Sequence, residues 1–217
     1  MRSYLSIFLV FVTFLFQAQT TVEDDFEGSG TITSWYGDDC GMDNTFANPF
    51  QTGINTSATV LEYTDSGGQY ANVRFDVEAN FDLSTNNTFS LKIYVPSSGI
   101  TGSSPNQISL KLQDGTLAQP WVTQSEIIKP IVLNEWQTVT FDFENDNYIN
   151  LSPSSPDPIA RTDFNRVLLQ VNGENNTSEV VAYIDDFLYD GTINIAPEPV
   201  FDNLVWSDEF DGNGAVN

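Results

Sequence analysis

The sequence has no histidine and only one cysteine among its 217 residues. Without histidine there is no imidazole to bind zinc or to act as a general base, and a Ser-His-Asp triad is excluded. The single cysteine, Cys40, cannot form an intramolecular disulfide, so the stability of the fold has to come from a hydrophobic core. We expect Cys40 to be a small buried thiol rather than a reactive one.

Basic residues are also scarce, with 7 Lys and Arg against 30 Asp and Glu, which gives a formal net charge of −23. A surface of this charge repels nucleic acid and anionic lipid, and it suits calcium and neutral ligands. The sequence contains no Gly-x-Ser-x-Gly motif, no phosphate-binding loop and no set of zinc ligands. We therefore expect no nucleic-acid partner.

No stretch shows a convincing helical period, whereas apolar residues alternate with polar ones in six segments. The six are Val73–Val77, Phe89–Val95, Ile108–Leu112, Val139–Phe143, Val167–Val171 and Val180–Ile184. This period of two is typical of half-buried antiparallel strands, and Gly-, Asn-, Asp- or Pro-rich turns lie between them. The pattern predicts an all-β fold, an antiparallel β-sandwich with jelly-roll topology.

The chain divides into four parts. Residues 1–19 carry Arg2 and a short apolar run, Leu5–Phe16, which indicates a secretory signal peptide rather than a membrane span. We expect the β-sandwich at 22–191, a Pro-containing linker at 192–203 and the start of another domain at 204–217. The mature protein is thus expected to be secreted, extracellular or periplasmic, with no membrane attachment, and to be a monomer.

The final part, Leu204–Asn217, contains Trp206-Ser-Asp-Glu-Phe-Asp-Gly and resembles the N-terminal edge of glycoside hydrolase family 16 catalytic domains. The resemblance implies that the parent protein is an endo-β-glucanase of the laminarinase type, truncated here. Family 16 enzymes use a Glu-x-Asp-x-Glu strand. The segment Glu23–Glu27 has the same residue pattern. It comes directly after the signal peptide, however, before any part of the domain that could form a catalytic cleft. We therefore expect no catalytic residues in this chain.

The sandwich itself resembles the galactose-binding-like jelly rolls that serve as carbohydrate-binding modules, in the style of families 4, 16 and 22. The segments that carry the resemblance are Asp25–Gly28, Trp35, Asn48-Pro49, Gly53–Ser57, Asn134–Phe143 and Tyr183–Tyr189. In such modules a structural calcium ion joins the first strand to the last. The resemblance assigns Glu27 and Asp185 as its ligands, with Asp25 and Asp186 as further candidates, and Ca²⁺ does prefer oxygen ligands. The alternative is that these carboxylates are merely solvated at strand ends.

Sugar recognition needs flat apolar surfaces for the pyranose ring and planar polar groups for its hydroxyls. Trp136 and Trp206 are expected in cores. Trp35 and Trp121 lie in polar loops and are expected to be exposed ligand contacts; the alternative for each is that it closes an end of the sandwich. The other candidates are Tyr36, Tyr70, Arg74, Gln113 and Gln170. Arg74, Gln113 and Gln170 point away from the apolar face of their strands and are placed to line a concave sheet, with Tyr70 beside them; a solvated face is the alternative.

These observations predict a secreted glycan-binding module that holds an attached β-glucanase on its polysaccharide, with a β-1,3-glucan such as laminarin as the expected partner. Two alternatives stay open. One is a structural or adhesion sandwich that only spaces its neighbour; exposure of Trp35 and Trp121 favours binding, and burial of both favours the spacer. The other is an N-terminal fragment whose activity belongs to the parent hydrolase.

Overall fold

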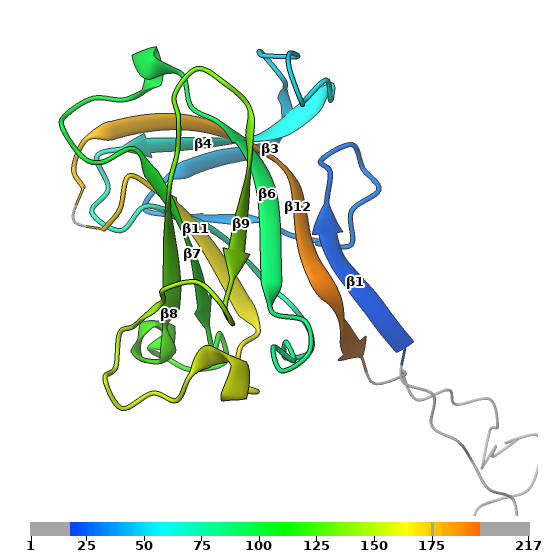
Figure 1. The fold of residues 1–217 in the computed structure, drawn as a ribbon. Helices are drawn as coiled ribbons and strands as arrows, with labels where there is room; N and C mark the ends of the chain where they lie inside the picture. The colour runs from blue at the N-terminus through cyan, green and yellow to red at the C-terminus, as the bar shows by residue number, and fades with distance from the viewer. Residues whose placement is uncertain (1–17, 175, 196–217) are drawn as a thin grey trace, which may run out of the picture.

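The computed structural model describes residues 18–174 and 176–195, which form two antiparallel sheets facing one another (Figure 1). The predicted all-β fold, an antiparallel β-sandwich of the jelly-roll type, is confirmed. The described residues include three short 3-10 turns, η1 (Ser97–Gly99), η2 (Pro120–Thr123) and η3 (Pro158–Ala160), and no α-helix. Among these residues no helix has the length and hydropathy needed to cross a bilayer.

Sheet A has six strands, and the long β12 is at its centre. In spatial order they are β3 (Gly41–Ala47), β4 (Thr59–Ser66), β12 (Glu179–Ile195), β6 (Thr88–Tyr94) and β9 (Gln137–Asp142), with β1 (Ala18–Asp24) beside β12. The first half of β12 pairs with β4 and the second half with β1. The register shifts where β12 bulges, and Asp186 adopts a positive φ of 46° there.

Sheet B also has six strands and short strands at both edges. In spatial order they are β10 (Ile149–Asn150), β8 (Ser125–Pro130), β7 (Gln107–Gln113), β11 (Arg166–Val171), β5 (Asn72–Asp76) and β2 (Tyr36–Asp38). Every pairing is antiparallel. The six predicted alternating segments correspond to β5, β6, β7, β9, β11 and the first part of β12.

The core lies between the sheets and is rich in aromatic rings. Trp35 contacts Phe75 and Phe187 edge-on, and Phe89 stacks with Tyr189. Edge-to-face contacts of this kind add stability beyond area burial. Cys40 borders this core and donates from Sγ to the Asn72 carbonyl at 3.0 Å. Burial raises the pKa of its thiol to about 12, as expected for an unreactive cysteine.

Part of the outer face of sheet A is covered by a second apolar cluster. Tyr94, Tyr183 and Trp136 are buried there beneath Phe50, and the Trp136 indole donates to the Phe50 carbonyl at 2.7 Å. The expectation that Trp136 is a core residue is confirmed. This part of the face is therefore occupied by the protein's own apolar side chains, whereas the outer face of sheet B carries mostly polar ones.

The β-sandwich begins earlier and ends later in the sequence than the expected range 22–191. β12 continues to Ile195, so residues 192–195, expected in the linker, pair with β1 instead. β1 in turn begins at Ala18, within the expected signal peptide. The rest of the expected signal peptide and linker, and the expected hydrolase segment 204–217 with Trp206, lie outside the described residues.

Candidate functional site

The outer face of sheet B carries a dense set of polar side chains. Core-facing Ile108, Leu110 and Leu112 alternate along β7 with residues on the opposite side, and β8, β11 and β5 follow the same rule. We call this surface the polar face; it comprises Gln107, Ser109, Lys111, Gln113, Gln124, Glu126, Gln170, Arg74, Asp76 and Arg166. Several of its central members are buried, Lys111 and Gln170 to 1% exposure each.

Lys111 is the centre of a hydrogen-bonded network on this face. Its Nζ donates to Oε1 of Gln170 and to Oε1 of Glu174, both at 2.6 Å, and lies 3.9 Å from Glu126. Gln124 links the network to Gln113 at 2.8 Å. Buried polar groups hold fixed positions when each has a partner. The network thus presents its amide and carboxylate groups in set orientations.

The pKa values of the two carboxyl groups in this network shift in opposite directions. Burial raises the pKa of Glu126, and the charge of Lys111 offsets this only in part. Burial acts in the same direction on Glu174, but the hydrogen bond and charge of Lys111, with help from Gln124, hold its pKa below the usual value. Glu174 is therefore the more firmly ionised of the two, and 33% of its side chain is exposed.

A hollow of about 270 Å³ opens beside this network at the β8–β10 edge, and we call it the β8–β10 hollow. It is lined by Gln107, Gln124, Glu126, Ile128, Ile149, Leu151, Gly173 and Glu174. The register pairs Ile149 with Glu126 and Ile128 with Ser109, which places both isoleucines on the polar face. The hollow therefore combines polar groups with an aliphatic wall of exposed Ile128, Ile149 and Leu151.

The opposite edge of the polar face carries an aromatic ring supported by charge. Tyr36 on β2 pairs with Arg74 on β5, and the guanidinium carbon lies 4.9 Å from the ring centroid. Arg74 is held by Asp38 at 2.7 Å and by Asp76 at 3.3 Å, and Asp76 also binds Arg166. Tyr36 is 48% exposed. Its ring is thus backed by a cation and remains accessible.

The structure brings several predicted ligand residues together. Tyr36, Arg74, Gln113 and Gln170 all belong to the outer face of sheet B. Tyr70 is exposed in the loop just before β5. Gln113 and Gln170 are more buried than a solvated face would leave them, because they are tied into the Lys111 network.

The two loop tryptophans differ in their exposure to solvent. Trp121 is 51% exposed in η2, as expected, three residues before Gln124. For Trp35 the expected exposure is wrong, because the side chain is only 7% exposed. Its indole donates to Oδ2 of Asp24 at 2.8 Å, and its ring packs between Phe26 and Phe75. Trp35 therefore closes the core, which is the alternative role considered for it.

Sequence reasoning missed Lys111, Gln124, Glu126, Glu174 and the aliphatic wall. For Lys111 a signal existed, since Gln107, Ser109, Lys111 and Gln113 occupy alternate positions on one predicted strand. Gln124 and Glu174 lie beyond strand ends, and no periodicity indicates where their side chains go. Glu174 follows the Asn172-Gly173 turn, in which both residues have positive φ.

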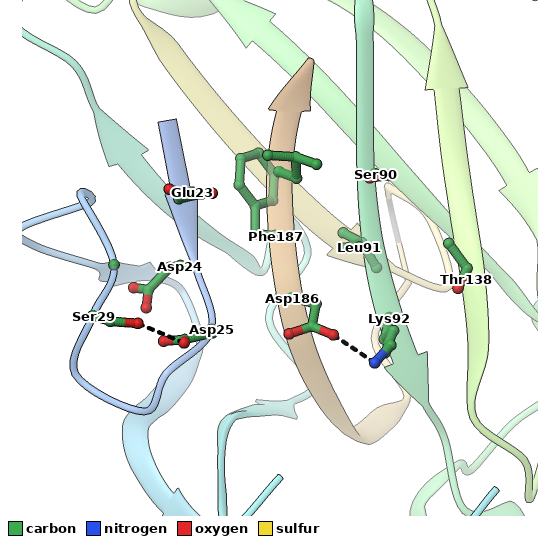
Figure 2. A pocket seen from close by; sticks show the side chains of 12 residues that line it. Glu23, Asp24, Asp25, Ser29, Ser90, Leu91, Lys92, Thr138, Asp186 and Phe187 are labelled. Atoms are coloured by element: carbon green, nitrogen blue, oxygen red, sulfur yellow. Dashed lines mark hydrogen bonds and ion pairs between the residues drawn. The ribbon is translucent and has the colours of Figure 1, made fainter. Parts of the chain in front are cut away.

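The four predicted calcium ligands do not share one cavity. Asp25 and Asp186 line a hollow of about 450 Å³ beside β1, β12 and β6, as Figure 2 shows. Asp186 is paired there with Lys92 at 2.5 Å, and Asp25 accepts from Ser29 at 2.6 Å. Glu27 accepts from the Thr59 amide, and the fully buried Asp185 accepts from Asn55 at 2.7 Å. The described residues include no group of three or more His, Cys, Asp or Glu placed to hold a metal ion. Calcium binding stays a prediction.

No protein-family model matches the sequence, and no curated protein matches it. Several solved structures are similar in chain path. The family 11 carbohydrate-binding module from Clostridium thermocellum, in complex with a β-1,3-1,4-mixed-linked tetrasaccharide, has 14% identity and a TM-score of 0.49, over 82% of this chain and 98% of that one. The C-terminal family 22 carbohydrate-binding module of Clostridium thermocellum Xyn10B has 17% identity and a TM-score of 0.46, over 82% and 94%. The agarase AgWH50C has 12% identity and a TM-score of 0.45, over 83% of this chain and 25% of that one. At these identities and TM-scores, what each neighbour binds stays a property of that neighbour.

Proposed function

We propose that this chain binds a glycan along the polar face of sheet B. The observation that carries the proposal is the arrangement of this face, in which hydrogen-bonding groups fixed by Lys111 lie between an accessible Tyr36 ring and the aliphatic wall. Binding sites for small molecules commonly combine apolar surface with a few fixed polar groups.

Sugar rings match this chemistry in two ways. Each hydroxyl both donates and accepts a hydrogen bond, so amides such as Gln124 and carboxylates such as Glu174 can be its partners. The apolar faces of a pyranose can rest on Tyr36 at one edge and on Ile149 at the other. Since the two edges are five strand spacings apart, or about 24 Å, an extended chain suits the face better than a single sugar.

The finer parts of the proposal come from the sequence. The glycan is a β-1,3-glucan, the protein is secreted and monomeric, and the module holds a family 16 β-glucanase on its polysaccharide without catalysing a reaction itself. Tethering raises the effective concentration of the enzyme, so weak binding at the module is enough.

Affinity gels test the proposal. The mature chain is run through gels containing laminarin, mixed-linkage β-glucan, xylan or no polysaccharide. We expect retardation by a β-glucan, and the polysaccharide that retards it names the ligand class. Equal mobility in every gel would overturn the proposal and support the spacer alternative, which the burial of Trp35 favours in part.

Single variants locate the binding surface. Tyr36→Ala and Ile149→Ala should each weaken binding by about 1–3 kcal/mol, because both remove exposed contact area from the polar face. Leu188→Ala is the matched control, since Leu188 is an exposed apolar side chain on sheet A. If Trp121→Ala abolishes retardation while Tyr36→Ala and Ile149→Ala leave it unchanged, binding occurs at the η2 loop and the assignment to the polar face is wrong.

A further inference from the structure

The β8–β10 hollow presents a negative charge to whatever enters it. Two carboxylates, from Glu126 and Glu174, border the hollow. Lys111, the one cation that pairs with them among the described residues, lies beneath the surface with 2% of its side chain exposed. A ligand therefore meets the carboxylates and not the ammonium group. Among the described residues, the hydrogen bonds to Glu174 all reach Oε1, from Lys111 and Gln124. The other oxygen, Oε2, is left to accept from a ligand.

The rest of the polar face offers no free cation to an anionic ligand. Within the described part of the chain, its other two cations are Arg74 and Arg166, and both are engaged. Arg74 binds Asp38 and Asp76, and Arg166 binds Asp76 through two nitrogens at 2.5 and 2.8 Å. A carboxylate or sulfate on the ligand would have to displace one of these pairs, and it would approach an ionised Glu174 if it entered the hollow.

We propose that the β8–β10 hollow is a subsite that selects neutral sugar rings and rejects acidic ones, with Glu174 accepting a hydrogen bond from a ring hydroxyl. This inference rests on the proposed glycan-binding function and narrows it to neutral glycans, excluding uronate-bearing and sulfated polymers. The physical reason is local: a hydroxyl donates to Glu174, whereas a carboxylate or sulfate at the same position meets like charge. Among the described residues, the cation nearest to it, Lys111, is buried and already bound to Glu174.

The test compares three forms of one β-glucan by isothermal titration calorimetry: the neutral polymer, its carboxymethyl derivative and its hydroxyethyl derivative. The hydroxyethyl form carries an uncharged substituent of similar size and so separates bulk from charge. We expect the native chain to bind the carboxymethyl form at least tenfold more weakly than the hydroxyethyl form. Glu174→Gln should remove most of that difference. The matched control is Glu135→Gln, which makes the same charge change at an exposed position before β9 of sheet A.

The outcomes separate the two proposals. If the native chain binds none of the three polymers and no glycan in the affinity gels, the proposed glycan-binding function is wrong. The proposed selection for neutral sugars is then wrong as well. If the native chain binds the carboxymethyl and hydroxyethyl forms equally, glycan binding stands and the selection is wrong. If Glu135→Gln relieves the difference as much as Glu174→Gln does, the discrimination comes from the overall charge of −23 and not from the hollow.

A folding control accompanies the variant. Glu174→Gln removes one partner of Lys111, so its thermal melting is measured beside the titrations. Should that variant be unfolded, Glu126→Gln replaces it, because Glu126 borders the same hollow and lies 3.9 Å from the same ammonium. An unchanged preference in a folded Glu126→Gln variant would then overturn the inference.

Discussion

Replacing Lys111 with methionine should destabilise the fold far more than an ordinary strand substitution. The side chain is 2% exposed, and its ammonium is the cation that neutralises Glu174 at 2.6 Å and Glu126 at 3.9 Å. Methionine fills a similar volume, so little of the loss comes from packing. Removing one member of a buried ion pair leaves the other charge uncompensated, at a cost of about 3–5 kcal/mol, and this applies most fully to Glu126, because 33% of the Glu174 side chain is exposed to solvent. For a domain of this size, each kcal/mol lowers the melting temperature by about 2–4 °C, so the total is roughly 6–20 °C.

The pH dependence of this loss identifies its cause. Burial already raises the pKa of Glu126, and without Lys111 it rises further, while Glu174 loses the contact that lowers its pKa. Protonation of either carboxyl removes a buried charge. The gap in unfolding free energy between the native chain and Lys111→Met should therefore shrink as the pH falls from neutral through these pKa values.

Urea unfolding followed by fluorescence of the buried Trp35 and Trp136 measures these free energies. Adding Glu126→Gln and Glu174→Gln to Lys111→Met should restore most of the stability, since neutral amides need no cation. A loss below about 1 kcal/mol at neutral pH, or a larger loss that neither acid nor the added substitutions reduce, would refute the account of Lys111 as a buried charge partner.

Three further predictions concern other parts of the molecule. Trp35→Phe should cost about 1–3 kcal/mol in urea unfolding, because Asp24 loses the indole donor, and it should leave glycan retardation in affinity gels unchanged; lost retardation by a folded variant would return Trp35 to the ligand candidates. The raised pKa of Glu126 means that its contribution to stability is present in acid and is lost as the pH rises through its folded-state value, so Glu126→Gln should flatten the fall in stability toward neutral pH, and an unchanged pH profile contradicts this. If Ca²⁺ joins the terminal strands, added Ca²⁺ should raise the melting temperature, and Asp185→Ala should lower it and abolish that response; an unaltered response would rule out Asp185 as a ligand.

The sequence predicts the side-chain faces of the strands well, because alternation depends only on local geometry. Period-two patterns alone predict that Arg74, Gln113 and Gln170 lie on the side opposite the core, and the register of β5, β7 and β11 places them there together. The alternation of buried and exposed side chains fails at the start of strand β4. Its Val60 and Leu61 are both fully buried, on opposite faces, because the second apolar cluster, with Phe50, covers Val60 on the outer side of sheet A.

Residues whose environment is made by distant segments were the least predictable. Trp35 looks like a loop residue in the sequence, yet its ring is enclosed by Phe75 and Phe187 from two different sheets. Lys111 reads as an exposed lysine at an outward position. Its ammonium is bound by Gln170 and Glu174, 59 and 63 positions later, and the residues around Lys111 in the sequence do not indicate these contacts.

The pairing of β1 with the end of β12 determines how the sandwich responds to force. Ala18 is opposite Ile195, so the chain enters and leaves the sheet at one point, and the ladder continues inward from there to Asp24 and Phe187. A pull applied to these two ends loads the backbone hydrogen bonds one pair at a time instead of shearing them all together. We expect β1 to peel away at low tension while the two sheets stay closed, so that the outermost strand yields first when the protein is stretched by its ends.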